Sequence, residues 1–301
     1  MEEYEKYGYV SPDKVGINKA STIPAFCKYH DNMLFRVIEH GEITPTAEQL
    51  CIFTFRALTY EIFMKKAVIE TSRKHQDLSD TYPTVSFYEQ MQRHEYMEGS
   101  KLHIYGCEIA LKELETDYKN LAKMIAQKKY SDCYYLLFKT NQIPQVLCTG
   151  YFNPSFDLNG NQIQDFSIEE TKTENISLTV FCNSGSGYIL FTWPVSVEYL
   201  EEYILSIVTQ KNLSNVLVSM IFSQFENHAF KQSWWESLSH IKKKDLCNKA
   251  FRASDSDYDE QGNIFPLKIV THLKYVDWQL VARTNNMTVA SKLDSINFPK
   301  Y

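Results

Sequence analysis

Cys27, His30 and Asp31 are the residues of this chain whose types and spacing come closest to a chemical site. A thiolate and an imidazole three positions apart can reach one ion, so the pattern is typical of half a zinc site. A structural zinc site takes four protein ligands and a catalytic one takes three. Residues 1–26 contain no Cys and no His, so the remaining ligands must come from distant residues such as His40, or from another chain.

The same cluster also fits a structural role, and this is the interpretation we favour. Cys27 is then a small buried residue, and His30 caps a turn with Asp31. Apolar residues around the cluster would dock the segment on the rest of the protein, namely Phe26, Leu34, Phe35 and Ile38. We therefore expect no cofactor, and zinc is the ion that the alternative requires.

Residues 15–58 resemble a signature of an uncharacterised bacterial protein family. The similarity lies in Gly16-Ile-Asn-Lys-Ala-Ser-Thr, in Phe26-Cys27-x-x-His30-Asp31-x-x-Leu34-Phe35-x-x-Ile38-Glu39 and in Phe55-Arg56-Ala57-Leu58, and more weakly in Asn227 and Trp235-Glu236. In fuller members a Cys-x-x-Cys pair and a Ser-His element precede this segment, and together they resemble a treble-clef or HNH-like zinc module. The resemblance implies a degenerate form of that module here, because the upstream Cys pair and its His are absent.

A second candidate site combines polar groups with large aromatic rings near Trp234 and Trp235. A tryptophan pair can stack a nucleotide base, and Asn227 and His228 supply hydrogen-bonding groups nearby. The alternative is a core position with a partly exposed rim, which is the commoner use of such rings. These four residues are our candidates for ligand binding.

Two further motifs favour structural interpretations. Gly185-Ser-Gly187 is followed by a strand pattern and not by a helix with a lysine, so it predicts a hairpin turn and not a phosphate loop. Asp255, Asp257 and Asp259 alternate as in a calcium loop, but Gly262 falls at the eighth position, which predicts a solvated acidic turn. Nucleophile-elbow, zinc-protease and nucleotide-loop motifs are absent from the sequence, so we lean towards a protein that is not an enzyme.

The composition of the 301 residues is that of a globular protein, with 44% hydrophobic and 23% charged residues. A net charge of -6 does not indicate nucleic-acid binding, although a local basic face is compatible with it. No apolar stretch approaches the ~18 residues of a membrane span, and the acidic first residues are unlike a signal peptide. Seven scattered cysteines, several in apolar runs, predict thiols without disulfides in a reducing cytoplasm.

Apolar residues recur every three or four positions from Thr46 to about His75, and again from Phe87 to Lys128. This period predicts two long amphipathic helices joined as an antiparallel hairpin. In the second helix we expect a buried stripe through Leu102, Tyr105 and Ile109. The two-residue step to Leu111 then moves this stripe around the helix.

The second half of the chain alternates blocks of strands and helices. Strand patterns occupy residues 133–139, 146–152, 176–182, 188–193 and 265–283, with the first two expected to pair and residues 183–187 to form a five-residue hairpin loop. Helical patterns occupy residues 197–210, 214–226 with Ser214 as a cap, and 233–249.

These patterns predict an α+β fold, with a long antiparallel helical hairpin packed beside a mostly antiparallel sheet and with further helices. We divide the chain into an irregular N-terminal arm with the Cys-x-x-His-Asp cluster at 1–45, the helical hairpin at 46–131 and a sheet-and-helix region at 132–301.

Three functions are compatible with the sequence. We favour a cytosolic bacterial binding or assembly protein, an accessory or effector component of an anti-phage defence system, with a protein partner or self-association. The first alternative is a metal-dependent, HNH-like nuclease or its degenerate relative, which depends on Cys27, His30 and Asp31 and on fold analogy. The second is a nucleotide or small-molecule sensor that uses the sheet and the Trp234–Trp235 region.

Overall fold

The structure is a computed structural model, which describes residues 8–16, 23, 25–40, 42–79, 86–130, 133–166, 173–194, 197–210, 212–225, 227–252 and 278–298. Its elements in chain order are α2 (Lys28–Glu39), α3 (Ala47–Ser79), α4 (Phe87–Gln127), β1 (Cys133–Thr140), β2 (Val146–Phe152), β3 (Ile176–Asn183), β4 (Ser186–Pro194), α5 (Glu198–Val208), α6 (Leu213–Gln224), β5 (His228–Phe230), α7 (Gln232–Ser237), α8 (His240–Arg252), β6 (Trp278–Arg283) and α9 (Ala290–Asp294). The predicted α+β fold is confirmed, with a helix pair beside an antiparallel sheet.

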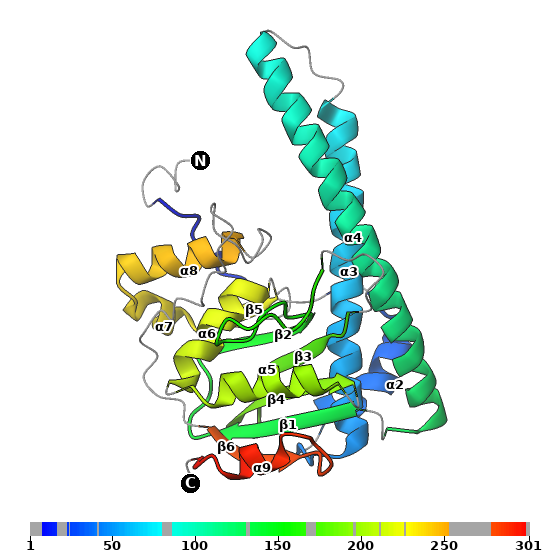
Figure 1. Cartoon of the computed structure of the whole chain (residues 1–301), viewed down its shortest axis with the longest axis vertical. Helices are drawn as coiled ribbons and strands as arrows, with labels where there is room; N and C mark the ends of the chain where they lie inside the picture. Colours follow the sequence, from blue (N-terminus) through cyan, green and yellow to red (C-terminus); the bar gives the residue numbers. More distant parts are fainter. Residues whose placement is uncertain are drawn as a thin grey trace.

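Helices α3 and α4 pack as an antiparallel hairpin whose far end projects from the rest of the molecule (Figure 1). Ser86 begins α4 with a capping box: its hydroxyl accepts from the amide of Glu89, and the Glu89 carboxylate accepts from the amide of Ser86. The helix ends at Lys128, which adopts a left-handed conformation with φ of 55°. Both helices therefore begin and end close to the predicted positions.

The buried side of α4 differs from the predicted stripe. Ile104 and Cys107 are buried and pack against Ile69 of α3, whereas Leu102 and Tyr105 are 72% and 52% exposed. The prediction that these two residues are buried is wrong, because α4 carries apolar residues on two faces and α3 covers only one. The buried stripe continues through Leu114 and Leu121 to the base of the hairpin.

The six strands form one antiparallel sheet in the order β5-β2-β3-β4-β1-β6. The predicted pairing of β1 with β2 is wrong, since β1 pairs with β4 and β6, and β2 pairs with β3 and β5. The link at 141–145 therefore crosses the end of the β3–β4 hairpin, a span of three strand spacings or ~14 Å. A Cβ on Gly187 would overlap the Pro144 ring in this link, so the crossing requires glycine there.

The β3–β4 hairpin is tighter than predicted. Asn183 lies opposite Ser186, which leaves only Ser184 and Gly185 in the turn. Both have positive φ, at 47° and 78°, as a type I′ turn requires. The expected five-residue loop is therefore a two-residue turn, because the strands continue pairing further than the apolar pattern indicates.

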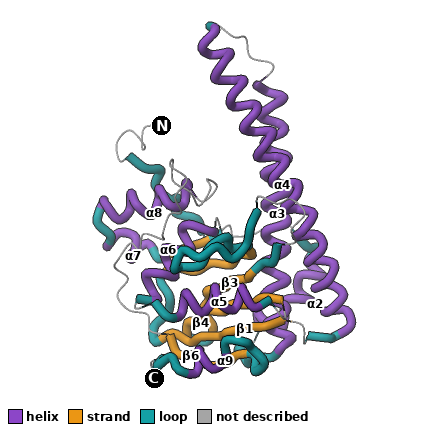
Figure 2. Tube along the Cα trace, viewed as in Figure 1, coloured by secondary structure: helices purple, strands orange, loops and turns teal. Residues whose placement is uncertain are grey.

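The sheet is covered on both faces (Figure 2). Leu136 and Phe138 of β1 point to one side, where they join the core formed with α5 and α6. Leu137, between them, points to the other side and packs in the core that includes α2 and α3. A buried hydrogen bond of 2.6 Å between the hydroxyls of Thr54 and Thr192 ties α3 to β4. The hairpin base is thus part of the folded body, which consists of the sheet and the helices on its faces.

The N-terminal segment was expected to be irregular through residue 45, and this is wrong for residues 28–39, which form α2. The signal was present in the sequence, because Leu34, Phe35 and Ile38 share one helical face. Phe35 and Ile38 are buried against α3, so tertiary packing stabilises a helix too short to form alone.

The helices after the sheet also differ in detail. The side chain of Asn212, and not Ser214, caps α6 by accepting from the amide of Asn215. The single helix expected at 233–249 is two helices, because Leu238 has extended backbone angles between α7 and α8. The strand expected at 265–283 is confirmed for β6, whereas residues 265–277 and the acidic turn at 255–263 lie outside the described residues.

In the part of the chain that the structure describes, no helix has the length and apolar character needed to cross a bilayer.

Candidate functional site

Cys27 and His30 lie at the start of α2, where they contact each other. Cys27 is the N-cap residue, and its sulfur lies 3.2 Å from Nδ1 of His30. Asp31 lies in the first helical turn, where a carboxylate is favourably placed relative to the helix dipole. Cys27 and His30 are exposed, and Asp31 is half-buried. The expectation that Cys27 is buried is therefore wrong, because α2 turns its start towards solvent and buries Phe35 and Ile38 instead. The spacing of Cys27 and His30 indicates that the thiol and the imidazole can reach each other, and the structure has this contact.

The described residues do not complete a metal site around this pair. No group of three or more His, Cys, Asp or Glu side chains that could hold an ion occurs among them. His40 lies at the opposite end of α2, and a 12-residue helix separates it from Cys27 by about 18 Å. Two donors fill neither a structural nor a catalytic zinc site. The metal hypothesis therefore depends on ligands outside the described residues or on another chain.

The apolar residues beside the cluster do dock α2 on the hairpin base, as predicted. Phe35 is 1% exposed; its ring meets that of Phe26 edge-on, with centroids 5.3 Å apart. The guanidinium of Arg56 from α3 lies over the same ring, 5.1 Å from its centroid, and Arg56 also pairs with Glu39 at 3.0 Å. The cluster at Cys27 is thereby held at the edge of a packed aromatic contact.

The second candidate site lies where β5 meets α7, and the structure does bring its four residues together. Trp234 is buried and contacts Phe230, and Phe230 in turn packs on Trp235 with centroids 5.1 Å apart. The Trp235 ring also lies near that of Trp234, with centroids 6.4 Å apart, and the Lys243 ammonium lies 5.8 Å from its centroid. These rings are thus largely engaged with one another, as in the core-and-rim alternative.

The polar members of this site hold β5 against the sheet. The Asn227 side-chain amide donates to the carbonyl of Thr149 at 3.3 Å, and the Thr149 amide donates to the carbonyl of Asn227. Nδ1 of His228 lies 2.7 Å from the carbonyl oxygen of Phe225. Burial lowers the pKa of His228, although this hydrogen bond opposes the shift. A neutral His228 therefore donates from Nδ1 within a mostly apolar cluster.

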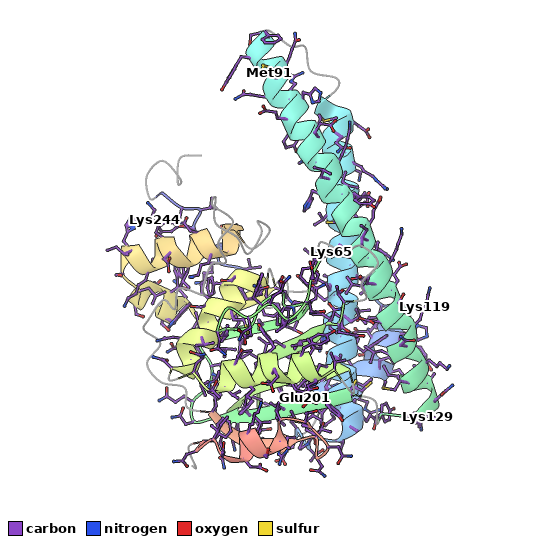
Figure 3. The ribbon with its side chains drawn as sticks, in the orientation of Figure 1. Lys65, Met91, Lys119, Lys129, Glu201 and Lys244 are labelled. Carbon is purple, nitrogen blue, oxygen red and sulfur yellow. The ribbon has the colours of Figure 1, made fainter. Side chains whose placement is uncertain are left out.

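The surface that stands out most in the structure is the solvent side of α4, which was not identified from the sequence. Its residues alternate in steps of three and four, and we call them the outer stripe: Tyr88, Met91, Glu95, Glu98, Leu102, Tyr105, Ile109 and Lys112. Tyr88 and Leu102 are 68% and 72% exposed, and Phe87 beside them is 76% exposed. Figure 3 places Met91 near the far end of the hairpin, away from the folded body.

Two glycines accompany the outer stripe. Gly99 and Gly106 lie seven residues apart, and a Cβ at either position would meet no atom within 4 Å. Glycine inside a helix costs about 1 kcal/mol relative to alanine, and here no neighbouring atom of the chain requires it. The glycine spacing is the signal in the sequence from which this face could have been identified.

No family model, no curated protein and no solved structure matches this chain.

Proposed function

We propose that this chain is a binding and assembly protein that engages a protein partner through the projecting part of the α3–α4 hairpin. The folded body anchors the hairpin base, and the far part of the hairpin presents the surface. The exposure of large apolar side chains along the outer stripe is the observation that carries the proposal.

The projecting shape supports this function. Helix α4 has 41 residues, which corresponds to a length of about 60 Å. Near its base, the Asp117 carboxylate accepts hydrogen bonds from Tyr151 at 3.0 Å and from Asn175 at 3.1 Å, which fix the helix to the sheet. Farther from the base, α4 lies beside α3 and extends beyond the sheet (Figure 1). A helix pair held rigidly at one end presents its other end to a partner at little further entropic cost.

The chemistry of the surface also supports binding. Exposed apolar residues scattered singly are normal, but contiguous ones mark interaction sites. Phe87, Tyr88 and Met91 form one such group near the tip, and Leu102 and Tyr105 form another about two-fifths of the way down α4. Tyrosine and phenylalanine are enriched at protein interfaces. Acidic and basic residues between and beside these groups, such as Glu95 and Lys112, would give a partner its orientation.

The location, the origin and the biological role that we propose for the chain rest on different observations. We propose a cytoplasmic location because no disulfide forms among the described residues, which include all seven cysteines. A bacterial origin rests on the resemblance of residues 15–58. A part in anti-phage defence, as an accessory or effector component, rests on the helical hairpin, the aromatic richness of the chain and the lack of a catalytic motif in its sequence. The nuclease alternative has no supporting observation beyond the two donors Cys27 and His30.

Site-specific photo-crosslinking tests the proposal. A photoreactive phenylalanine analogue is placed at Leu102 in the full chain and is irradiated in cells that express it. The matched control carries the same analogue at Ile241 of α8, which is also highly exposed but lies on the folded body. We expect one predominant protein adduct, identified by mass spectrometry, from Leu102 and none from Ile241. Equal or absent adducts at the two positions would contradict the proposal.

A further inference from the structure

We propose that the partner of the outer stripe is a second copy of this chain, and that the two α4 helices pair antiparallel about a two-fold axis near residues 103 and 104. This inference rests on the proposed function, because it names the partner of the same surface. It is carried by the position of the stripe on the helix, by two glycines and by the order of charges.

The outer stripe has the spacing of a helix-pairing seam. Its steps of three and four residues are those of the a and d positions of a heptad repeat, which keep one face towards a second helix. Leu102 and Ile104 differ by two positions, or about 200° around the helix. Because Ile104 packs on α3, the stripe faces away from α3. Helix α4 thus has one seam filled by its own chain and a second seam exposed.

Gly99 and Gly106 flank the stripe on one side, in the same heptad position. Open space surrounds the site of a Cβ at both. In an antiparallel pair, Gly99 of one copy lies opposite Gly106 of the other copy. At its centre this flank of the pair then lacks side chains, so the two backbones can approach closely there. The larger Leu102 and Tyr105 fill the seam beside it.

The charges along the stripe favour an antiparallel second copy. Towards the tip the stripe carries Glu95 and Glu98, and towards the base it carries Lys112, with Lys119 one heptad further (Figure 3). Parallel pairing would place glutamates against glutamates. Antiparallel pairing with Leu102 opposite Tyr105 of the second copy places Glu95 opposite Lys112 of the second copy, and does so twice because of the symmetry.

The other flank of the same register is also complementary. Lys101 of one copy falls beside Glu108 of the other, again twice, and Glu108 then lies between this lysine and Arg73 of its own α3, with which it forms an ion pair. The second glutamate of the stripe, Glu98, lies 2.7 Å from Lys101 of its own helix, which compensates its charge. One register thus satisfies the apolar centre, the glycine flank and the charged flank together.

The available area fits a modest interface. An aromatic side chain buries roughly 150–250 Å². From their exposed fractions, Tyr88, Met91, Leu102 and Tyr105 together would bury roughly 450 Å² per copy. The sum over two copies is about 900 Å², which is below the roughly 1,200–2,000 Å² of stable specific interfaces and within the range of weak, transient ones. We therefore expect reversible self-association at micromolar concentrations.

Sedimentation equilibrium of the purified full chain between about 1 and 100 µM tests the inference through a charge swap. The wild type should show a monomer–dimer equilibrium. Glu95→Lys or Lys112→Glu alone should weaken dimerisation by about tenfold or more, because each places like charges together. The double variant Glu95→Lys/Lys112→Glu should recover to within about threefold of the wild type.

Two controls accompany the charge variants. Far-UV circular dichroism verifies that each variant keeps its helices, and Ile241→Ser, an exposed apolar position elsewhere, should leave the dissociation constant unchanged. A monomeric wild type, or a dimer whose strength none of the charge variants alters, would overturn the inference. If the wild type is monomeric and Leu102 still crosslinks to a different protein, the proposed function stands and only the identity of the partner is wrong.

Discussion

Replacing Phe35 by alanine should lower the free energy of unfolding by about 3–4 kcal/mol, within the range for large-to-small changes in cores. The ring is 1% exposed and belongs to the core that α2 shares with α3 and the sheet. Its edge-on contact with Phe26 and the Arg56 guanidinium over its face are lost together with the buried apolar area.

The magnitude follows from these contacts. Burial of roughly 150–200 Å² at about 25 cal/mol per Å² gives about 4–5 kcal/mol as an upper bound. The aromatic pair adds about 0.5–1.5 kcal/mol. Helix α2 lies at the edge of the core and can move into part of the cavity, which reduces the total to the lower part of the expected range. Phe35→Leu keeps most of the apolar volume and should cost about 1–1.5 kcal/mol.

Equilibrium unfolding in urea, followed by far-UV circular dichroism and tryptophan fluorescence, measures these differences. Tyr29→Ala is the matched control, because Tyr29 lies on the same helix and is 71% exposed; its effect should stay within about 0.5 kcal/mol. If Phe35→Ala changed the unfolding free energy by less than about 1 kcal/mol, α2 would not be a stabilising part of the core, and our reasoning would be refuted.

Four further predictions concern other parts of the chain. Gly150→Ala should lower the unfolding free energy by about 1–3 kcal/mol or more in the same urea assay, because a Cβ there would overlap the Phe225 ring; a neutral effect would disprove the close approach. Because burial lowers the pKa of His228, the unfolded state binds more protons as the pH falls below about 6.5. The free energy of unfolding of the wild type should therefore fall between pH 7.5 and pH 5.5, and that of His228→Asn should fall less. Parallel pH profiles of the two proteins would contradict this. Thiol titration of denatured, unreduced protein should recover all seven cysteines, and five or fewer would reveal a disulfide. A chelator should leave the melting temperature unchanged, whereas one equivalent of zinc by elemental analysis, with unfolding on chelation, would show that Cys27 and His30 are metal ligands.

The sequence alone was sufficient to predict most of the regular elements. Helices α3 and α4 follow from long runs of apolar residues at helical spacing, and β1 to β4 follow from short apolar and aromatic runs bounded by turn residues. These features are local, since a helix period or a turn preference depends on neighbours within a few residues. The docking of Phe35 was also predicted, from the apolar residues that surround the Cys27 cluster, although the helix that carries it was not.

The tertiary structure decided which element each apolar face meets. Strand β1 lies beside β4 and not beside β2, because pairing depends on how the 141–145 link crosses the sheet, which no local pattern encodes. Helix α4 has apolar residues on two faces, and only packing shows that Ile104 turns inward and Leu102 outward. The hydrophobic effect favours the burial of apolar side chains, but it is non-directional and does not specify which element buries them. The sequence therefore determined which side chains gain free energy from burial. The three-dimensional arrangement decided which of them are buried and which, along the outer stripe, remain exposed.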